Sequence, residues 1–128
     1  MQYSIDKKVN YGFEQAKTLV TEKLKEEGFG ILTEIDVQAT LKKKIGVEFK
    51  KYVILGACNP NFAHQALQVE DKLGVLLPCN VVLIEQEDGS VDISAIDAFN
   101  MMNQINNPAL SPIAKQVGER LQKVMDSL

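Results

Sequence analysis

Hydrophobic positions along the first third of the chain predict a strand, a helix, a second strand and a short helix. Alternating apolar residues over 2–9 are typical of a strand that could lie at a sheet edge. Helical spacing follows over 12–27, and Gly28 is suited to end that helix because glycine enters the left-handed conformation freely. Alternation returns over 29–35, after which Asp36 is suited to cap a short helix.

The middle of the chain predicts a buried strand followed by a helix. Residues 52–58 are apolar throughout, which is typical of a strand that is central in its sheet or covered on both faces. Asn59 and Pro60 then predict a helix start, in which the Asn59 side chain supplies the capping oxygen and Pro60 takes the first helical position. Gly74 is expected to end this helix.

The last third of the chain predicts a hairpin and two helices. The apolar run 80–86 and the alternating residues 91–95 flank a turn over 87–90, which indicates two antiparallel neighbouring strands. A helical turn follows over 98–102, with Ser94 or Asp97 as its cap, and a helix with an apolar stripe from Ile113 to Leu128 closes the chain.

This order of elements predicts one α+β domain spanning residues 1–128. Each amphipathic helix must bury its apolar stripe against another layer. The simplest arrangement is a single sheet of about five strands with helices packed chiefly on one face. A chain of 128 residues is one domain's worth of protein, so a second core is not expected.

Composition and charge narrow the classes of function. A net charge of -3 excludes a protein that binds nucleic acid mainly through positive charge. The apolar runs are far shorter than the ~20 residues of a spanning helix, and the first residues lack the pattern of a signal peptide. We therefore expect no membrane partner. The two cysteines, without a secretory signal, favour reduced thiols in the cytoplasm.

Basic residues concentrate in one segment, residues 42–51. This segment carries +4, which leaves -7 on the remainder of the chain. An acidic partner could dock there, although a solvated helix and loop face is the commoner meaning of such a run.

Several segments resemble a bacterial family called domain of unknown function 302. The segments are Ile-Leu-Gly-Ala-Cys-Asn-Pro at 54–60, Ala-His-Gln-Ala-Leu at 63–67 and Leu-Leu-Pro-Cys-Asn-Val-Val-Leu at 76–83. The resemblance implies a compact α+β fold grouped with TATA-binding-protein-like folds, which is an architectural grouping and implies no DNA binding. It also implies a homodimer, and it assigns no activity. The chain departs from the family at Ala98, where proline is usual.

Cys58, His64 and Cys79 form the first candidate site. Thiolates and imidazole suit Zn²⁺ or Cu⁺, and all three residues fall within 22 positions. The spacing matches no standard zinc motif, and a closed tetrahedral site needs a fourth ligand such as Glu70 or Asp71. The alternative is two cysteines at strand ends and a histidine on the solvent side of the helix.

The relative direction of the two strands decides whether Cys58 and Cys79 can share a metal ion. If strands 52–58 and 80–86 are parallel, Cys58 and Cys79 lie at opposite ends of the sheet and share no ion. If the strands are antiparallel, both cysteines meet at one end. The sequence leaves both arrangements open.

Cys58 also precedes a predicted helix start, which lowers the pKa of a thiol. A cysteine nucleophile with His64 as its base is therefore one hypothesis. Alternatively, the helix start at Asn59 and Pro60 could hold an anion through backbone amides.

Two classes of function follow from these residues. The first is a cytoplasmic binding or accessory module that takes a thiophilic metal ion, such as zinc, or a small ligand. The second is a thiol-dependent or redox enzyme that uses Cys58 with His64. The sequence contains ligands for a site but no assembled catalytic set, which favours the first.

Overall fold

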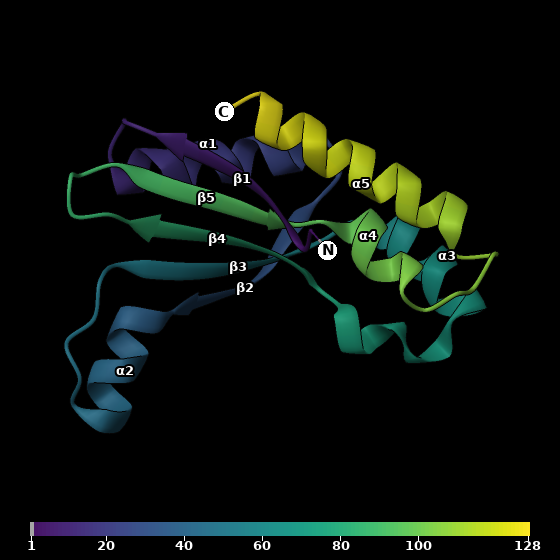
Figure 1. Cartoon of the computed structure of the whole chain (residues 1–128), viewed down its shortest axis with the longest axis horizontal. Coiled ribbons are helices and arrows are strands. Elements are labelled where there is room, and N and C mark those ends of the chain that lie inside the picture. Colours follow the sequence, from purple (N-terminus) through teal and green to yellow (C-terminus); the bar gives the residue numbers. More distant parts are fainter. Residues whose placement is uncertain (1) are drawn as a thin grey trace.

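The computed structural model describes residues 2–128, and its centre is a five-stranded antiparallel sheet (Figure 1). The strands pair in the order β1-β5-β4-β3-β2, so that the first two strands of the chain form the two edges. The strands that carry the two cysteines, β3 and β4, are neighbours in this order and run antiparallel, which decides between the two arrangements that the sequence left open. The strand bounds are β1 (Ser4–Val9), β2 (Gly30–Asp36), β3 (Tyr52–Cys58), β4 (Cys79–Glu85) and β5 (Val91–Ile96).

Helices cover the sheet chiefly on one face, as the sequence predicts. α1 and α5 lie side by side over that face, while α2 lies away from both (Figure 1). The bounds of the helical segments are α1 (Phe13–Glu26), α2 (Val37–Ile45), α3 (Pro60–Val69), the 3₁₀ segment η1 (Asp71–Leu76), α4 (Ala98–Asn103) and α5 (Ser111–Asp126).

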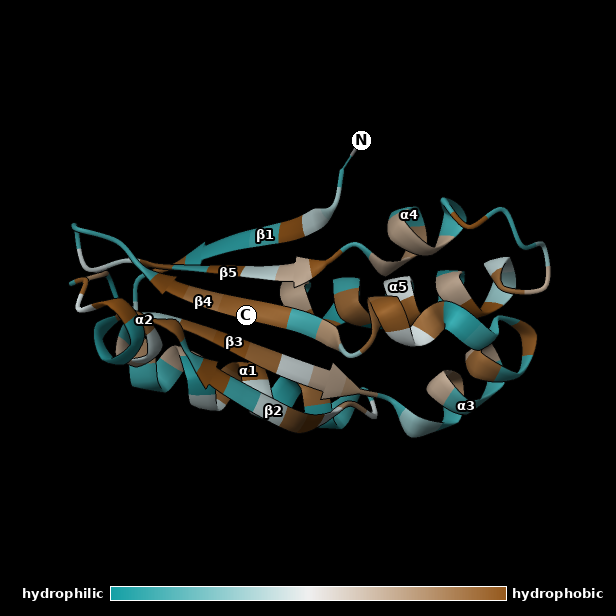
Figure 2. Ribbon diagram, turned by 90° about the horizontal axis from the view of Figure 1, so that it is seen from below, coloured by the Kyte–Doolittle hydropathy of each residue, from teal (hydrophilic) through white to brown (hydrophobic). Residues whose placement is uncertain are grey.

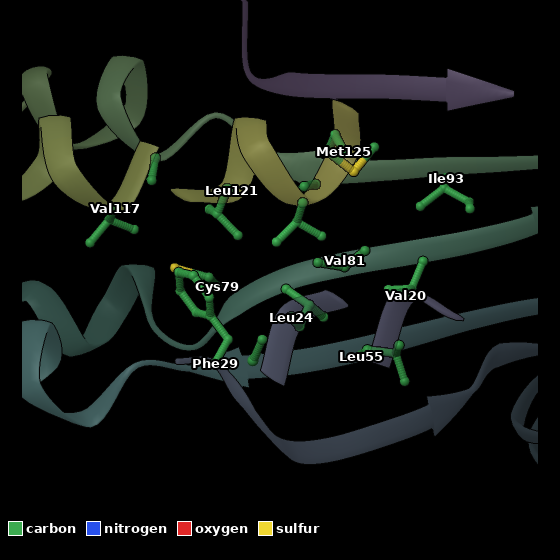
Figure 3. Packing of buried hydrophobic residues seen from close by; sticks show 14 of the residues in the cluster. Val20, Leu24, Phe29, Leu55, Cys79, Val81, Ile93, Val117, Leu121 and Met125 are labelled. Carbon is green, nitrogen blue, oxygen red and sulfur yellow. The ribbon is translucent and has the colours of Figure 1, made fainter. Parts of the chain in front are cut away.

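The hydrophobic core lies between the sheet and the helices α1 and α5 (Figure 3). Successive side chains of a strand point to opposite faces, so every second residue of β3, β4 and β5 enters the core. Leu55, Leu83 and Ile93 are at most 1% exposed, and they pack with Leu24 of α1 and Leu121 of α5. Each such side chain contributes about 2 kcal/mol of hydrophobic stabilisation.

The opposite face of the sheet remains partly exposed. Its central strands β3 and β4 are hydrophobic along most of their length (Figure 2). The apolar residues of this face are half-buried rather than enclosed, and they include Tyr52, Ile54, Val82, Ile84 and Ile96. The sheet therefore presents an apolar surface that neither α1 nor α5 covers.

Three residues at helix ends have the conformation or the hydrogen bond that their residue types predict. Gly28 has a φ of +88° and follows α1. The Asp36 carboxylate accepts a hydrogen bond from the Ala39 amide at 2.9 Å and caps α2. The Asp97 carboxylate accepts one from the Asn100 amide at 3.0 Å and caps α4. These bonds satisfy amide groups that a helix start leaves free.

The helix after Asn59 is shorter than its sequence indicates. α3 ends at Val69, and Gly74 lies inside the separate 3₁₀ segment. The chain turns at Glu70, whose backbone is extended, and the Asn107 side chain donates to the Val69 carbonyl at 2.8 Å. The expected end at Gly74 was wrong because a distant side chain takes up the carbonyl that a longer helix would use.

Candidate functional site

The antiparallel ladder brings the two cysteines to one end of the sheet. Cys79, the first residue of β4, pairs with Ala57, the neighbour of Cys58. Cys58 itself ends β3 and pairs with Gly30 on the other side. The strand pairing therefore makes a shared site possible, which the parallel alternative would have excluded.

Both cysteines line one small cavity, which we call the strand-end crevice. It has a volume of about 20 Å³ and lies between the ends of β3 and β4, α3, α4 and α5. Its walls are almost entirely apolar. The lining residues are Phe29, Ala57, Cys58, Asn59, Phe62, Ala63, Ala66, Leu73, Leu77, Cys79, Met102, Ile113 and Val117.

The two thiols differ in their surroundings. Cys79 is 4% exposed and lies among core residues (Figure 3), whereas Cys58 is half-buried; both are free thiols. Burial, and to a smaller extent the neighbouring Cys58 side chain, raise the pKa of Cys79 from 9.0 to about 11. Cys79 is therefore protonated at neutral pH unless a bound cation displaces its proton.

His64 does not join the cysteines. It lies exposed on α3 and is not among the residues that line the strand-end crevice. Across residues 2–128, no group of three or more histidine, cysteine, aspartate or glutamate side chains is placed to hold a metal ion. Glu70, expected as a fourth ligand, instead accepts a hydrogen bond from Asn107 at 3.2 Å. The structure thus brings two of the three predicted ligands together.

Met102 also lines the crevice, and the sequence did not associate it with the two cysteines. It comes from α4 and is 4% exposed, so its thioether adds a third sulfur-bearing side chain to the lining. A methionine far from the cysteines in sequence carries no spacing signal. Its place in the same lining as the cysteines depends on the tertiary position of α4.

Asn59 does not cap α3 in the way its sequence position predicts. No side-chain oxygen caps this helix; instead, the Asn59 amide nitrogen donates to the Glu27 carbonyl at 3.3 Å. Arg120 of α5 donates to the same carbonyl at 3.1 Å. The expectation of a capping oxygen was wrong because the end of α1 presents a free carbonyl to this buried side chain.

Arg120 also lies close to the helix start at Asn59 and Pro60, which the sequence suggested as an anion-binding site. The Arg120 guanidinium carbon lies 5.1 Å from the centre of the Phe62 ring, which itself lines the crevice. Pro60 is exposed at the first turn of α3. Positive charge from Arg120 and from the helix start therefore lies beside the Cys58 end of the crevice.

The basic segment 42–51 is solvent-exposed over residues 42–50. α2 contains no buried residue, and its last turn carries Lys42, Lys43 and Lys44. Lys42 also pairs with Glu48 in the following loop. The exposure agrees with the solvated face that the charge run commonly indicates.

The fold and this crevice define a class of α+β protein with an open antiparallel sheet and two cysteines at one strand end. The family "Domain of unknown function DUF302" matches residues 5–128, and the chain belongs to this family. A solved structure of an uncharacterised conserved DUF302 protein from Bacillus stearothermophilus shares 31% sequence identity, a TM-score of 0.90 and 98% coverage of both chains. The family carries no assigned activity.

One curated relative is an uncharacterised protein from Aquifex aeolicus strain VF5. It is 28% identical over 67 residues, which cover 52% of this chain and 46% of that protein. The match thus spans less than half of the relative's length. In residues 2–128, none of the helices has the length and apolar character needed to cross a bilayer.

Proposed function

We propose that this chain is a small binding module that holds a thiophilic metal ion, zinc or another soft cation, between Cys58 and Cys79. The observation that carries the proposal is that both cysteines line the strand-end crevice. Thiolates bind such ions strongly, and the apolar lining offers no oxygen cluster for Mg²⁺ or Ca²⁺. Two thiolates leave open positions, which water, another side chain or a second copy could fill.

A cadmium titration of the reduced protein tests this proposal. Cd²⁺ bound by thiolates gives an ultraviolet charge-transfer band, and we expect saturation at one ion per chain. Cys58→Ser and Cys79→Ser should each remove most of the band. His64→Ala is the matched control and should leave it unchanged. Absence of the band in the wild-type protein under anaerobic conditions would overturn the proposal.

The proposal places the protein in a reducing compartment, the cytoplasm, because oxidised cysteines bind no metal. It also makes a catalytic role for Cys58 with His64 the weaker alternative, since His64 lies outside the crevice. A thiol probe at pH 6 separates the two functions. A Cys58 that reacts no faster than free cysteine excludes the thiol enzyme, whereas rapid reaction that falls in His64→Ala supports it.

We also propose that two copies associate through the open face of the sheet. The half-buried apolar residues on β3 and β4 support this arrangement, as do the exposed Leu32 and Ile35 on edge strand β2. Light scattering at micromolar concentration should give twice the monomer mass, and added salt should not dissociate an apolar contact. A monomer mass would overturn the proposal.

A further inference from the structure

The strand-end crevice contains sulfur from three separate elements. Cys58 ends β3, Cys79 begins β4 and Met102 lies on α4. All three side chains belong to the lining of the same cavity. Building on the metal site proposed above, we infer that the bound ion is Cu⁺ and that the Met102 thioether is its third ligand.

The size of the cavity argues for an ion rather than an organic molecule. Sites for drug-sized ligands measure hundreds of Å³, whereas this crevice has a volume of about 20 Å³. That space could also hold one water molecule. A buried water, however, needs two to four polar partners, and the lining is dominated by apolar side chains.

The ligand set favours Cu⁺ over Zn²⁺. Zinc prefers four ligands drawn from thiolate, imidazole and carboxylate, and His64 and Glu70 both lie outside the crevice. Thiolate and thioether sulfur are the soft ligands that select Cu⁺. A monovalent d¹⁰ ion is satisfied by two or three sulfur ligands, which matches the number of sulfur-bearing side chains in the crevice.

The charge around the crevice suits this complex. Binding of Cu⁺ by two thiols releases two protons and leaves a net charge of -1 on the two thiolates and the ion. α3 begins at Pro60, two residues after Cys58, and the free amides of its first turn favour negative charge. The Arg120 guanidinium stacks on Phe62 at 5.1 Å and adds a second positive group at the rim.

The test is competition for Cu⁺ against a colorimetric bidentate chelator under anaerobic conditions. We expect the wild-type protein to bind one Cu⁺ per chain. Met102→Leu should weaken Cu⁺ binding by at least tenfold but leave the cadmium band unchanged. The matched control is Met101→Leu, since Met101 is the neighbouring residue and is not among the lining residues. Leucine conserves the volume of methionine, so both variants should keep the fold, which circular dichroism will verify.

X-ray absorption of the selenomethionine-labelled protein gives a second readout. A copper–selenium distance should be present in the wild type and Met101→Leu, and absent in Met102→Leu. If Met102→Leu binds Cu⁺ as tightly as the wild type and no copper–selenium shell exists, the assignment of Met102 fails while the two-cysteine site survives. If the wild type binds neither Cd²⁺ nor Cu⁺, the proposed function fails as well.

Discussion

Ala57 and Cys79 face each other in the antiparallel ladder of β3 and β4. Through this pair, the cysteine that follows Ala57 and the cysteine that begins β4 come to the same end of the sheet. The segment between them contains α3 and then the 3₁₀ segment η1. After these two elements the chain has returned to the end of the sheet that it left, so that β4 starts beside the end of β3. The candidate site is thus a direct consequence of strand direction.

The raised pKa of Cys79 predicts a loss of stability at alkaline pH. Burial, with a smaller contribution from Cys58, raises this pKa from 9.0 to about 11, so the folded state keeps a proton that the unfolded state loses between these values. The stabilising contribution is complete below pH 9 and is lost as pH rises through 11, at about 1.4 kcal/mol per pH unit. Urea unfolding of the reduced protein from pH 8 to 11 should show a steeper decline for the wild type than for Cys79→Ala. Parallel declines would contradict the prediction.

Gly56 is expected to tolerate no side chain. A Cβ at this position would overlap the Thr33 hydroxyl oxygen and lie 2.7 Å from Cγ of Pro78. Gly56→Ala should therefore lower the free energy of unfolding by about 1–3 kcal/mol, the usual cost of overpacking. Gly30→Ala in the neighbouring strand is the control, because a Cβ there meets no atom within 4 Å. Chemical denaturation that gives equal stabilities for the two variants would exclude this explanation.

Asn59→Asp distinguishes a helix cap from a hydrogen-bond donor. A capping role predicts little change, since aspartate caps helices as well as asparagine does. The structure instead uses the Asn59 amide as a donor to the Glu27 carbonyl, and an aspartate there would place an acceptor against an acceptor. We expect a loss of about 1–3 kcal/mol in unfolding free energy. Unchanged or improved stability in thermal unfolding would restore the capping role.

Removal of the α2 cap should have a local effect. Asp36 is the residue whose side chain caps this helix, and α2 has no buried residue to hold it in place. Asp36→Ala should weaken the helix by about 1 kcal/mol. Hydrogen exchange of the α2 amides should then become about fivefold faster, while exchange in β3 and β4 stays unchanged. Slow exchange throughout α2 would show that other contacts stabilise it.

Much of the fold could be predicted because its signals are local. The apolar run 52–58 coincides with β3, and the turn over 87–90 joins two antiparallel strands as expected. Gly28, Asp36 and Asp97 each act within a few residues of their own position. Backbone conformation and capping depend on near neighbours, so the sequence contains the information needed for them.

The candidate site was only partly predictable. Cys58 and Cys79 were identified by their chemistry, but the pattern did not show whether their strands ran parallel or antiparallel. His64 was grouped with them because it is close in sequence, yet it lies exposed outside the crevice. The sequence did not place Met102 with the cysteines, because only the tertiary position of α4 puts it in the lining of the same crevice.

Local periodicity, turn residues and caps therefore established an α+β chain with about five strands and the approximate place of each element. Tertiary packing established which chemical groups meet. Asn59 shows the reason: its sequence context favours a cap, but the free carbonyl of Glu27, 32 residues away, offers a hydrogen bond that only the folded chain can form. The strand-end crevice arises in the same way, because its walls belong to strands and helices that come together only when the core excludes water.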